Sequence, residues 1–111
     1  MADIRYNHRL ATLGQADAKT LSIEIGPIAF DSRALLYSTI DHELFHVQKQ
    51  FIGGDVRPDR RHTRELQAYQ FILDNHEKYG FSEAELAAEV RKRNYYYFQV
   101  FGVPFNGGGV L

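Results

Sequence analysis

The chain has 111 residues, no cysteine and a formal net charge of −1, from 13 Lys and Arg against 14 Asp and Glu. Disulfides and thiolate metal sites are therefore excluded, and the charge balance provides no general attraction to nucleic acid or to an anionic membrane. A hydrophobic content of 44% predicts a folded core, and the length predicts one domain over residues 1–111. No signal peptide is visible, and no apolar run approaches the roughly 20 residues of a membrane span.

The N-terminal third predicts a small amount of sheet. Residues 5–13 are read as a short helix and residues 14–17 as a turn. Apolar and polar residues then alternate from Leu21 to Ile25, as in a half-buried strand. Gly26-Pro27 ends this alternation, although the apolar run continues to Phe30. Because proline lacks an amide hydrogen, the strand is expected at a sheet edge or at a bend.

The sequence predicts a helix over about residues 33–51, in the middle of the chain. Asp31 or Ser32 supplies its N-cap, and Gly53-Gly54 stops it. Apolar residues recur along it at helical spacing, which predicts one face turned to the core. These residues are Leu36, Ile40, Leu44, Val47 and Phe51.

Two further helices follow. One is predicted over about residues 62–79, with Gly80 as its C-cap, after a polar surface loop that contains Pro58. The other is predicted over about residues 83–94, because Ser82 and Glu85 form a capping box. The aromatic residues 95–98 favour a strand or an extension of this helix. The expected fold class is α+β: a short β-sheet with an edge strand beside three helices.

Residues 42–46 read His-Glu-Leu-Phe-His, the H-E-x-x-H pattern, inside the first predicted helix. Positions four apart on a helix differ by about 40° in azimuth, so His42 and His46 can ligate one ion. Glu43 lies about 100° round from His42, where it can reach water beside that ion and act as general base. The alternative is a purely structural pair of histidines.

Glu65 is the predicted third ligand. It lies near the start of the next helix, nineteen residues after His46, and is followed by Ala68, whose small side chain lets two helices approach. Two imidazoles and a carboxylate form a catalytic zinc shell with a fourth position open to water. We therefore expect Zn²⁺ held by His42, His46 and Glu65.

Other residues have two readings each. Tyr69, one turn after Glu65, either orients a ligand through its hydroxyl or is a core tyrosine. Among the three consecutive tyrosines 95–97, Tyr96 is the candidate for stabilising a developing oxyanion, against simple aromatic packing. His62 either faces the metal or lies at a solvated helix start, and Asp41 either supports a ligand or is exposed.

The loop between the first two helices is rich in charge. It carries a basic cluster interrupted by two acidic residues, which predicts a solvated loop or a surface for an acidic partner. The cluster comprises Arg57, Arg60, Arg61 and Arg64, with Asp55 and Asp59 between them.

Residues 42–46 together with Glu65-Leu66-Gln67-Ala68 resemble the gluzincin branch of zinc metallopeptidases. The resemblance implies that His42, His46 and Glu65 are zinc ligands and that Glu43 is the catalytic base. It also implies that the strand before the active-site helix, residues 23–30, is an edge strand that holds an extended peptide. In many gluzincins an acidic residue follows the ligand-helix Ala; here Tyr69 stands there, so a ligand histidine needs support from elsewhere.

A narrower resemblance covers about residues 20–98. Residues 23–30, 38–43, 65–75, 79–82 and 93–97 are similar to small metallopeptidase domains at the C-termini of bacterial Rhs-type polymorphic toxins. Such a domain implies export within a larger effector, action in the cytoplasm of a competing cell, a protein or peptide substrate and a cognate immunity protein.

Two rival functions remain. One is a regulatory module that binds zinc and captures a peptide while cleaving little. The other is a metal-free domain, such as a nuclease or transferase that uses His and Arg. Metal content separates the second rival from the metallopeptidase, and a Glu43→Gln variant separates the first.

Overall fold

Three short strands form a mixed sheet near the N-terminus. In the computed structural model, which describes residues 3–106, they are β1 (Ile4–Tyr6), β2 (Gly14–Ala16) and β3 (Ile23–Ile25), in the order β1-β3-β2. β3 pairs in parallel with β1 and antiparallel with β2. The strand expected at the edge is therefore the central strand, and β2 is the edge strand beside the first helix.

The prediction for residues 5–17 is wrong. The expected helix contains part of β1, and the expected turn is β2. Both strands depend on β3, which is distant in sequence: the amide of Ile23 donates to the Asp3 carbonyl at 2.7 Å, and the amide of Gly26 donates to the Leu13 carbonyl at 2.8 Å. Such non-local pairing overrides the weak local preference of a three-residue segment.

The predicted bend after Ile25 is confirmed. Pro27 begins a short 3₁₀ turn, η1 (Pro27–Asp31), instead of continuing the strand. Ser32 then caps α1 (Arg33–Phe45), its hydroxyl accepting from the Leu35 amide at 3.0 Å. The helix runs on as a π-helical segment, η2 (His46–Phe51), so the predicted helix 33–51 is confirmed with wider winding in its last turns.

The apolar stripe of this helix faces the sheet, as predicted. Val47 is fully in the core with Ile23, Ile25 and Ala29. The other four members of the stripe, Leu36, Ile40, Leu44 and Phe51, pack against that core. Apolar residues at helical spacing thus pack the helix that carries the H-E-x-x-H residues against the sheet.

The second helix is shorter than predicted. After the 3₁₀ turn η3 (Pro58–Arg60), α2 runs over Arg61–Asp74, and a separate 3₁₀ turn, η4 (His76–Lys78), follows. Asn75 breaks the helix because its side-chain amide donates to the Phe71 carbonyl at 2.8 Å. Asparagine competes in this way with the helical hydrogen bonds of the backbone.

The third helix is longer than predicted. α3 (Glu83–Phe101) begins with the expected capping box of Ser82 and Glu85. It continues through the aromatic residues 95–98, which extend the helix and form no strand. Gly102 ends it with a φ of +73°, a conformation that favours glycine.

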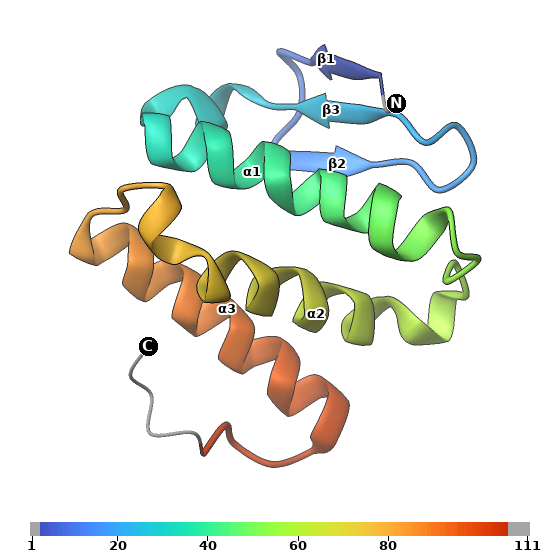
Figure 1. The fold of residues 1–111 in the computed structure, drawn as a ribbon, viewed down its shortest axis with the longest axis vertical. Coiled ribbons are helices and arrows are strands. Elements are labelled where there is room, and N and C mark those ends of the chain that lie inside the picture. Colours follow the sequence, from blue (N-terminus) through green and yellow to red (C-terminus); the bar gives the residue numbers. More distant parts are fainter. Residues whose placement is uncertain (1–2, 107–111) are drawn as a thin grey trace.

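The sheet and the three α-helices form successive layers in the order in which they occur along the chain. Figure 1 shows the sheet on one side of α1, α2 on the other side of α1, and α3 beyond α2. Ala68 of α2 is fully buried, which permits the close approach expected of it. Within residues 3–106, each helix is too short or too polar to cross a membrane.

Gly14 shows how closely β2 approaches α1. A Cβ added there would lie 2.8 Å from Thr39 Cγ2 and 3.3 Å from Glu43 Cγ. We expect Gly14→Ala to lower the free energy of unfolding by roughly 1–3 kcal/mol, the usual range for overpacking. Urea denaturation measures the change. Gly53→Ala is the matched control, because its Cβ would meet nothing nearer than the Gln50 carbonyl at 3.6 Å. Equal stability of the two variants would contradict the close packing of β2 on α1.

Candidate metal centre

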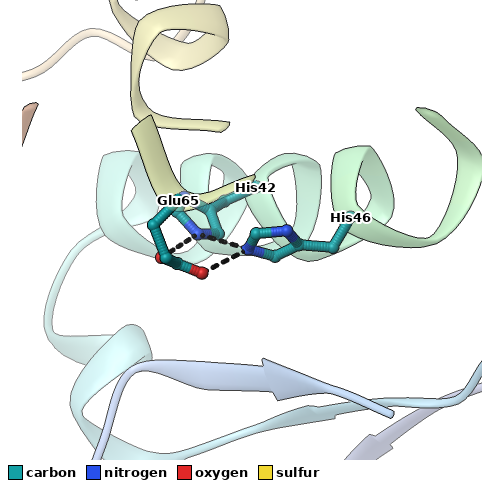
Figure 2. A group of neighbouring side chains, drawn as sticks. All are labelled: His42, His46 and Glu65. Atoms are coloured by element: carbon teal, nitrogen blue, oxygen red, sulfur yellow. Dashed lines mark hydrogen bonds and ion pairs between the residues drawn. The ribbon is translucent and has the colours of Figure 1, made fainter. Parts of the chain in front are cut away.

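His42, His46 and Glu65 converge on one point between α1 and α2. Figure 2 shows the Glu65 carboxylate directed at both imidazoles across the gap between the helices. Glu65 Oε1 lies 2.6 Å from His46 Nε2, and Oε2 lies 3.4 Å from His42 Nε2. The two Nε2 atoms are 3.1 Å apart. These three residues form a group that could hold a metal ion.

The donor set fits a divalent ion of the size and preference of zinc. Ligands at 2.0–2.2 Å from a tetrahedral ion lie about 3.3–3.6 Å from one another. Two of the three observed donor separations, 3.1 and 3.4 Å, lie close to that range, and the 2.6 Å separation needs a small outward shift of Glu65. Both histidines are buried, with 8% and 5% of their surface exposed, so solvent competes little for these donors.

Gln50 fixes the ring of His46. Its side-chain nitrogen donates to the Arg64 carbonyl at 2.9 Å and to Gln67 Oε1 at 3.0 Å. Its oxygen therefore faces His46 Nδ1, at 2.6 Å, and accepts a hydrogen bond from it. With Nδ1 carrying the hydrogen, Nε2 is the atom left to bind a metal. This is the outer support that ligand histidines require.

Glu43 faces the same space without joining the ligand group. It is 7% exposed and lines the cavity beside His42 and His46. Burial raises the pKa of this carboxyl; the fields of His42 and His46 oppose the shift, and that of Glu65 adds to it. A raised pKa suits a residue that must both accept and return a proton near neutral pH.

His46 and Glu65 form a partly buried ion pair. Burial alone would lower the pKa of His46, but its hydrogen bond to Glu65 and the field of that carboxylate outweigh burial and raise it. Burial alone would raise the pKa of Glu65, but hydrogen bonds from His42 and His46 outweigh burial and hold it far below the usual range.

These shifts predict how metal-free stability depends on pH. The contribution of Glu65 is present above its unfolded pKa of 4.5 and is lost as pH falls below that value. The contribution of His46 is present below its unfolded pKa of 6.5 and is lost as pH rises through its raised folded pKa. Glu43, with a raised pKa, favours the folded state most below its unfolded pKa of 4.5, and this contribution is lost as pH rises through its folded pKa. We therefore expect maximal metal-free stability between these two pKa values.

Urea denaturation in the presence of a chelator, at intervals from about pH 4 to 9, measures this dependence. A metal-free stability that increases steadily above pH 6.5 would contradict the assigned ion pair.

A cavity of about 820 Å³ opens beside the metal group. Its walls come from the loop and strand of residues 11–16, from α1, from α2 and from α3. Its ionisable lining residues are His42, Glu43, His46, Arg61, Arg64, Glu65, Tyr69, Glu89, Lys92 and Tyr96. The cavity is large enough for a few residues of an extended peptide.

Two of the predicted tyrosines reach this cavity. The ring of Tyr69 meets the His42 ring edge to face, with centroids 4.6 Å apart, and stacks on Tyr96 at 5.6 Å. In the described part of the chain, the Tyr69 hydroxyl makes no hydrogen bond to a ligand, so Tyr69 supports His42 by ring packing. Tyr95 is 55% exposed, and Tyr97 lies in a separate apolar groove with Phe101.

The remaining candidates lie outside the ligand group. His62 packs against Tyr96, with ring centroids 5.8 Å apart. Asp41 is an anchor between helices: it accepts hydrogen bonds from Lys78 Nζ and from the Tyr79 hydroxyl, both at 2.8 Å.

The charged loop is internally paired. Asp59 accepts two hydrogen bonds from Arg57, and Asp55 accepts two from Arg60. Arg64 is buried; it reaches Asp55 Oδ1 at 3.3 Å and the Arg57 carbonyl at 2.7 Å. This loop therefore stabilises the start of α2, the turn that presents Glu65.

Two residues beside the candidate site were not predicted from the sequence. Gln50 lies four residues after His46, so helical spacing alone places it on the same face. Glu89 lies three residues after Leu86, on the same side of the predicted helix, which makes it a charged residue beside an apolar position. The structure confirms its burial, with 6% of its surface exposed.

Comparison with models of known protein families, with curated proteins and with solved structures found no match to this chain. The interpretation of the site therefore depends on its own geometry.

Proposed function

We propose that the protein is a zinc-dependent peptide hydrolase. The observation that supports this most strongly is the convergence of His42, His46 and Glu65 beside a cavity that Glu43 also lines. Two buried imidazoles and a carboxylate are the donor set of catalytic zinc sites. Zinc held there would act as a Lewis acid on water and on the substrate carbonyl.

Glu43 performs the proton transfers in this proposal. Its carboxylate takes a proton from the attacking water as the oxygen bonds to the peptide carbonyl carbon. It then gives that proton to the leaving nitrogen as the C–N bond breaks. One carboxyl group thus serves as base and then as acid, and it ends the cycle in its starting state.

Tyr96 is the proposed donor to the developing oxyanion. Its side chain lines the cavity beside Tyr69. Burial and then the field of Glu65 raise the pKa of the phenol, while Arg61 opposes the shift. The hydroxyl therefore keeps its proton at neutral pH and can donate it in a hydrogen bond.

The edge strand β2 is the proposed substrate platform. The amide of Asp17 donates to the Ser22 carbonyl, and the Leu13 carbonyl accepts from Gly26. Odd-numbered residues of this segment thus bond to β3, so the backbone groups of Gly14 and Ala16 face the other way. The Gly14 carbonyl accepts a long hydrogen bond from the Thr12 hydroxyl at 3.3 Å. An extended peptide that displaces this bond can add to the edge, next to Glu43.

The proposed setting is an antibacterial effector. It is supported by the resemblance of residues 20–98 to the metallopeptidase domains of Rhs-type toxins. On this proposal, a larger effector delivers the domain into the cytoplasm of a competing cell, and an immunity protein neutralises it in the producer.

The test is expression in a bacterial host, combined with incubation of purified zinc-loaded protein with a diverse peptide mixture and mass spectrometry of the products. Cleavage at defined peptide bonds and growth arrest support the proposal. Zinc-dependent peptide binding without cleavage would instead indicate the regulatory binding module. Cleavage by a protein free of metal would contradict the zinc mechanism.

A further inference from the structure

Glu89 is a buried carboxyl group that the proposed reaction does not use. It lies on α3, is 6% exposed and lines the cavity that holds the metal group. Its Oε2 atom is inaccessible to solvent and has no hydrogen-bond partner among the described residues. A buried carboxylate without a partner is costly, so the fold tolerates it where another interaction compensates.

The pKa of Glu89 reflects the side chains around it. Burial raises the pKa of its carboxyl, and Lys92 and then His42 oppose that shift. Burial is the largest cause of the raised pKa values of Tyr69 and Tyr79, and the charge of Glu89 adds to both shifts. Glu89 therefore lines the same cavity as His42 of α1 and Tyr69 of α2.

The two ligand histidines differ in their support. Gln50 accepts a hydrogen bond from His46 Nδ1. For His42, the ring of Tyr69 supplies packing, but no side-chain acceptor for Nδ1 lies within hydrogen-bond distance in the described part of the chain. A carboxylate commonly serves this purpose at histidine ligands. Three glutamates line the cavity that contains His42, and Glu89 is the one that is neither a proposed ligand nor the predicted base.

We propose that Glu89 is a supporting residue of the metal site: from the wall of the same cavity, its buried carboxylate compensates the charge of the bound cation. The inference rests on the proposed zinc function. When a dication binds, Glu65 supplies one negative charge within the ligand set, and Glu89 supplies another from α3. This role would explain why an otherwise unpartnered carboxylate lies in the wall of the cavity.

The proposal predicts that removing the charge of Glu89 weakens zinc binding without lowering the stability of the metal-free protein. Glu89→Gln keeps the size of the side chain but removes its charge. Zinc affinity, measured by competition with a fluorescent chelator, should fall about 10- to 100-fold. The midpoint of urea unfolding in the metal-free protein should not fall, because an unpartnered buried carboxylate has been removed. Glu89→Asp, which retains the charge, should recover part of the zinc affinity.

Glu83→Gln is the matched control, since it removes a charge from an exposed position of α3. It should bind zinc as the parent chain does. A Glu89→Gln protein with unchanged zinc affinity would overturn the role of Glu89 alone. One that loses metal-free stability would show a purely structural role and overturn it as well. A parent chain that binds no zinc would overturn both this inference and the proposed function.

Discussion

Replacing Glu43 with Gln is expected to lower kcat/KM for peptide hydrolysis by about 10²- to 10⁴-fold, the usual contribution of general acid–base catalysis. Gln has nearly the same shape but cannot take a proton from water. Because Glu43 lies outside the group of His42, His46 and Glu65, the variant should retain zinc. Peptide cleavage assays, with zinc content measured on the same samples, provide the test.

The matched control is Glu77→Gln, which removes a carboxylate from the exposed turn η4. It should leave both cleavage and zinc content unchanged. Full activity of the Glu43→Gln protein would contradict the assignment of Glu43 as the base. Loss of zinc along with activity would mean that Glu43 holds the metal instead of acting on water.

Removing zinc is expected to lower the unfolding temperature by roughly 15 °C. An ion present at about 1,000 times its dissociation constant stabilises the folded state by about 4 kcal/mol. In a domain of this size, each kcal/mol corresponds to about 4 °C or slightly more. The effect has a structural cause: His42 and His46 lie on one continuous helix and Glu65 on α2, so the ion links two elements.

Thermal unfolding with added zinc and with excess chelator measures the difference for each variant. In Glu65→Ala, the difference between the two conditions should shrink to a few degrees, whatever the variant does to metal-free stability. A chelator effect of equal size in Glu65→Ala and in the parent chain would show that any stabilising ion binds elsewhere.

The helices could be predicted because their signals are local. Ser32 and the pair Ser82 and Glu85 lie within one turn of the amides that they cap. The stripe from Leu36 to Phe51 follows the helical period, and its burial against the sheet matches that pattern. The end of α2 was missed because a single side-chain hydrogen bond from Asn75 decides it.

The sheet could be predicted only in part. β3 alternates clearly, but β1 and β2 have three residues each and are held by partners distant in sequence. Gly14 reads as a turn residue from sequence. In the structure, glycine is required at this position because Thr39 and Glu43 approach so closely that no room is left for a Cβ. Tertiary packing of this kind leaves no trace in a local pattern.

The candidate site likewise contains residues that local sequence patterns predict and residues whose contribution depends on tertiary packing. The spacing of His42 and His46 and the position of Glu65 on the next helix are visible in sequence, and the structure brings the three residues together. Their supports were less visible. The Gln50 amide is oriented by acceptors on α2, and Glu89 comes from α3, so both contributions depend on how the helices pack.

The most direct test of the zinc site is a zinc titration of the purified chain followed by X-ray absorption spectroscopy at the zinc edge. We predict one zinc per chain, with imidazole nitrogens and a carboxylate oxygen at about 2.0–2.2 Å, and loss of this signature in Glu65→Ala. A chain that binds no stoichiometric zinc, or one whose zinc environment is unchanged by Glu65→Ala, would contradict a metal centre shared by α1 and α2.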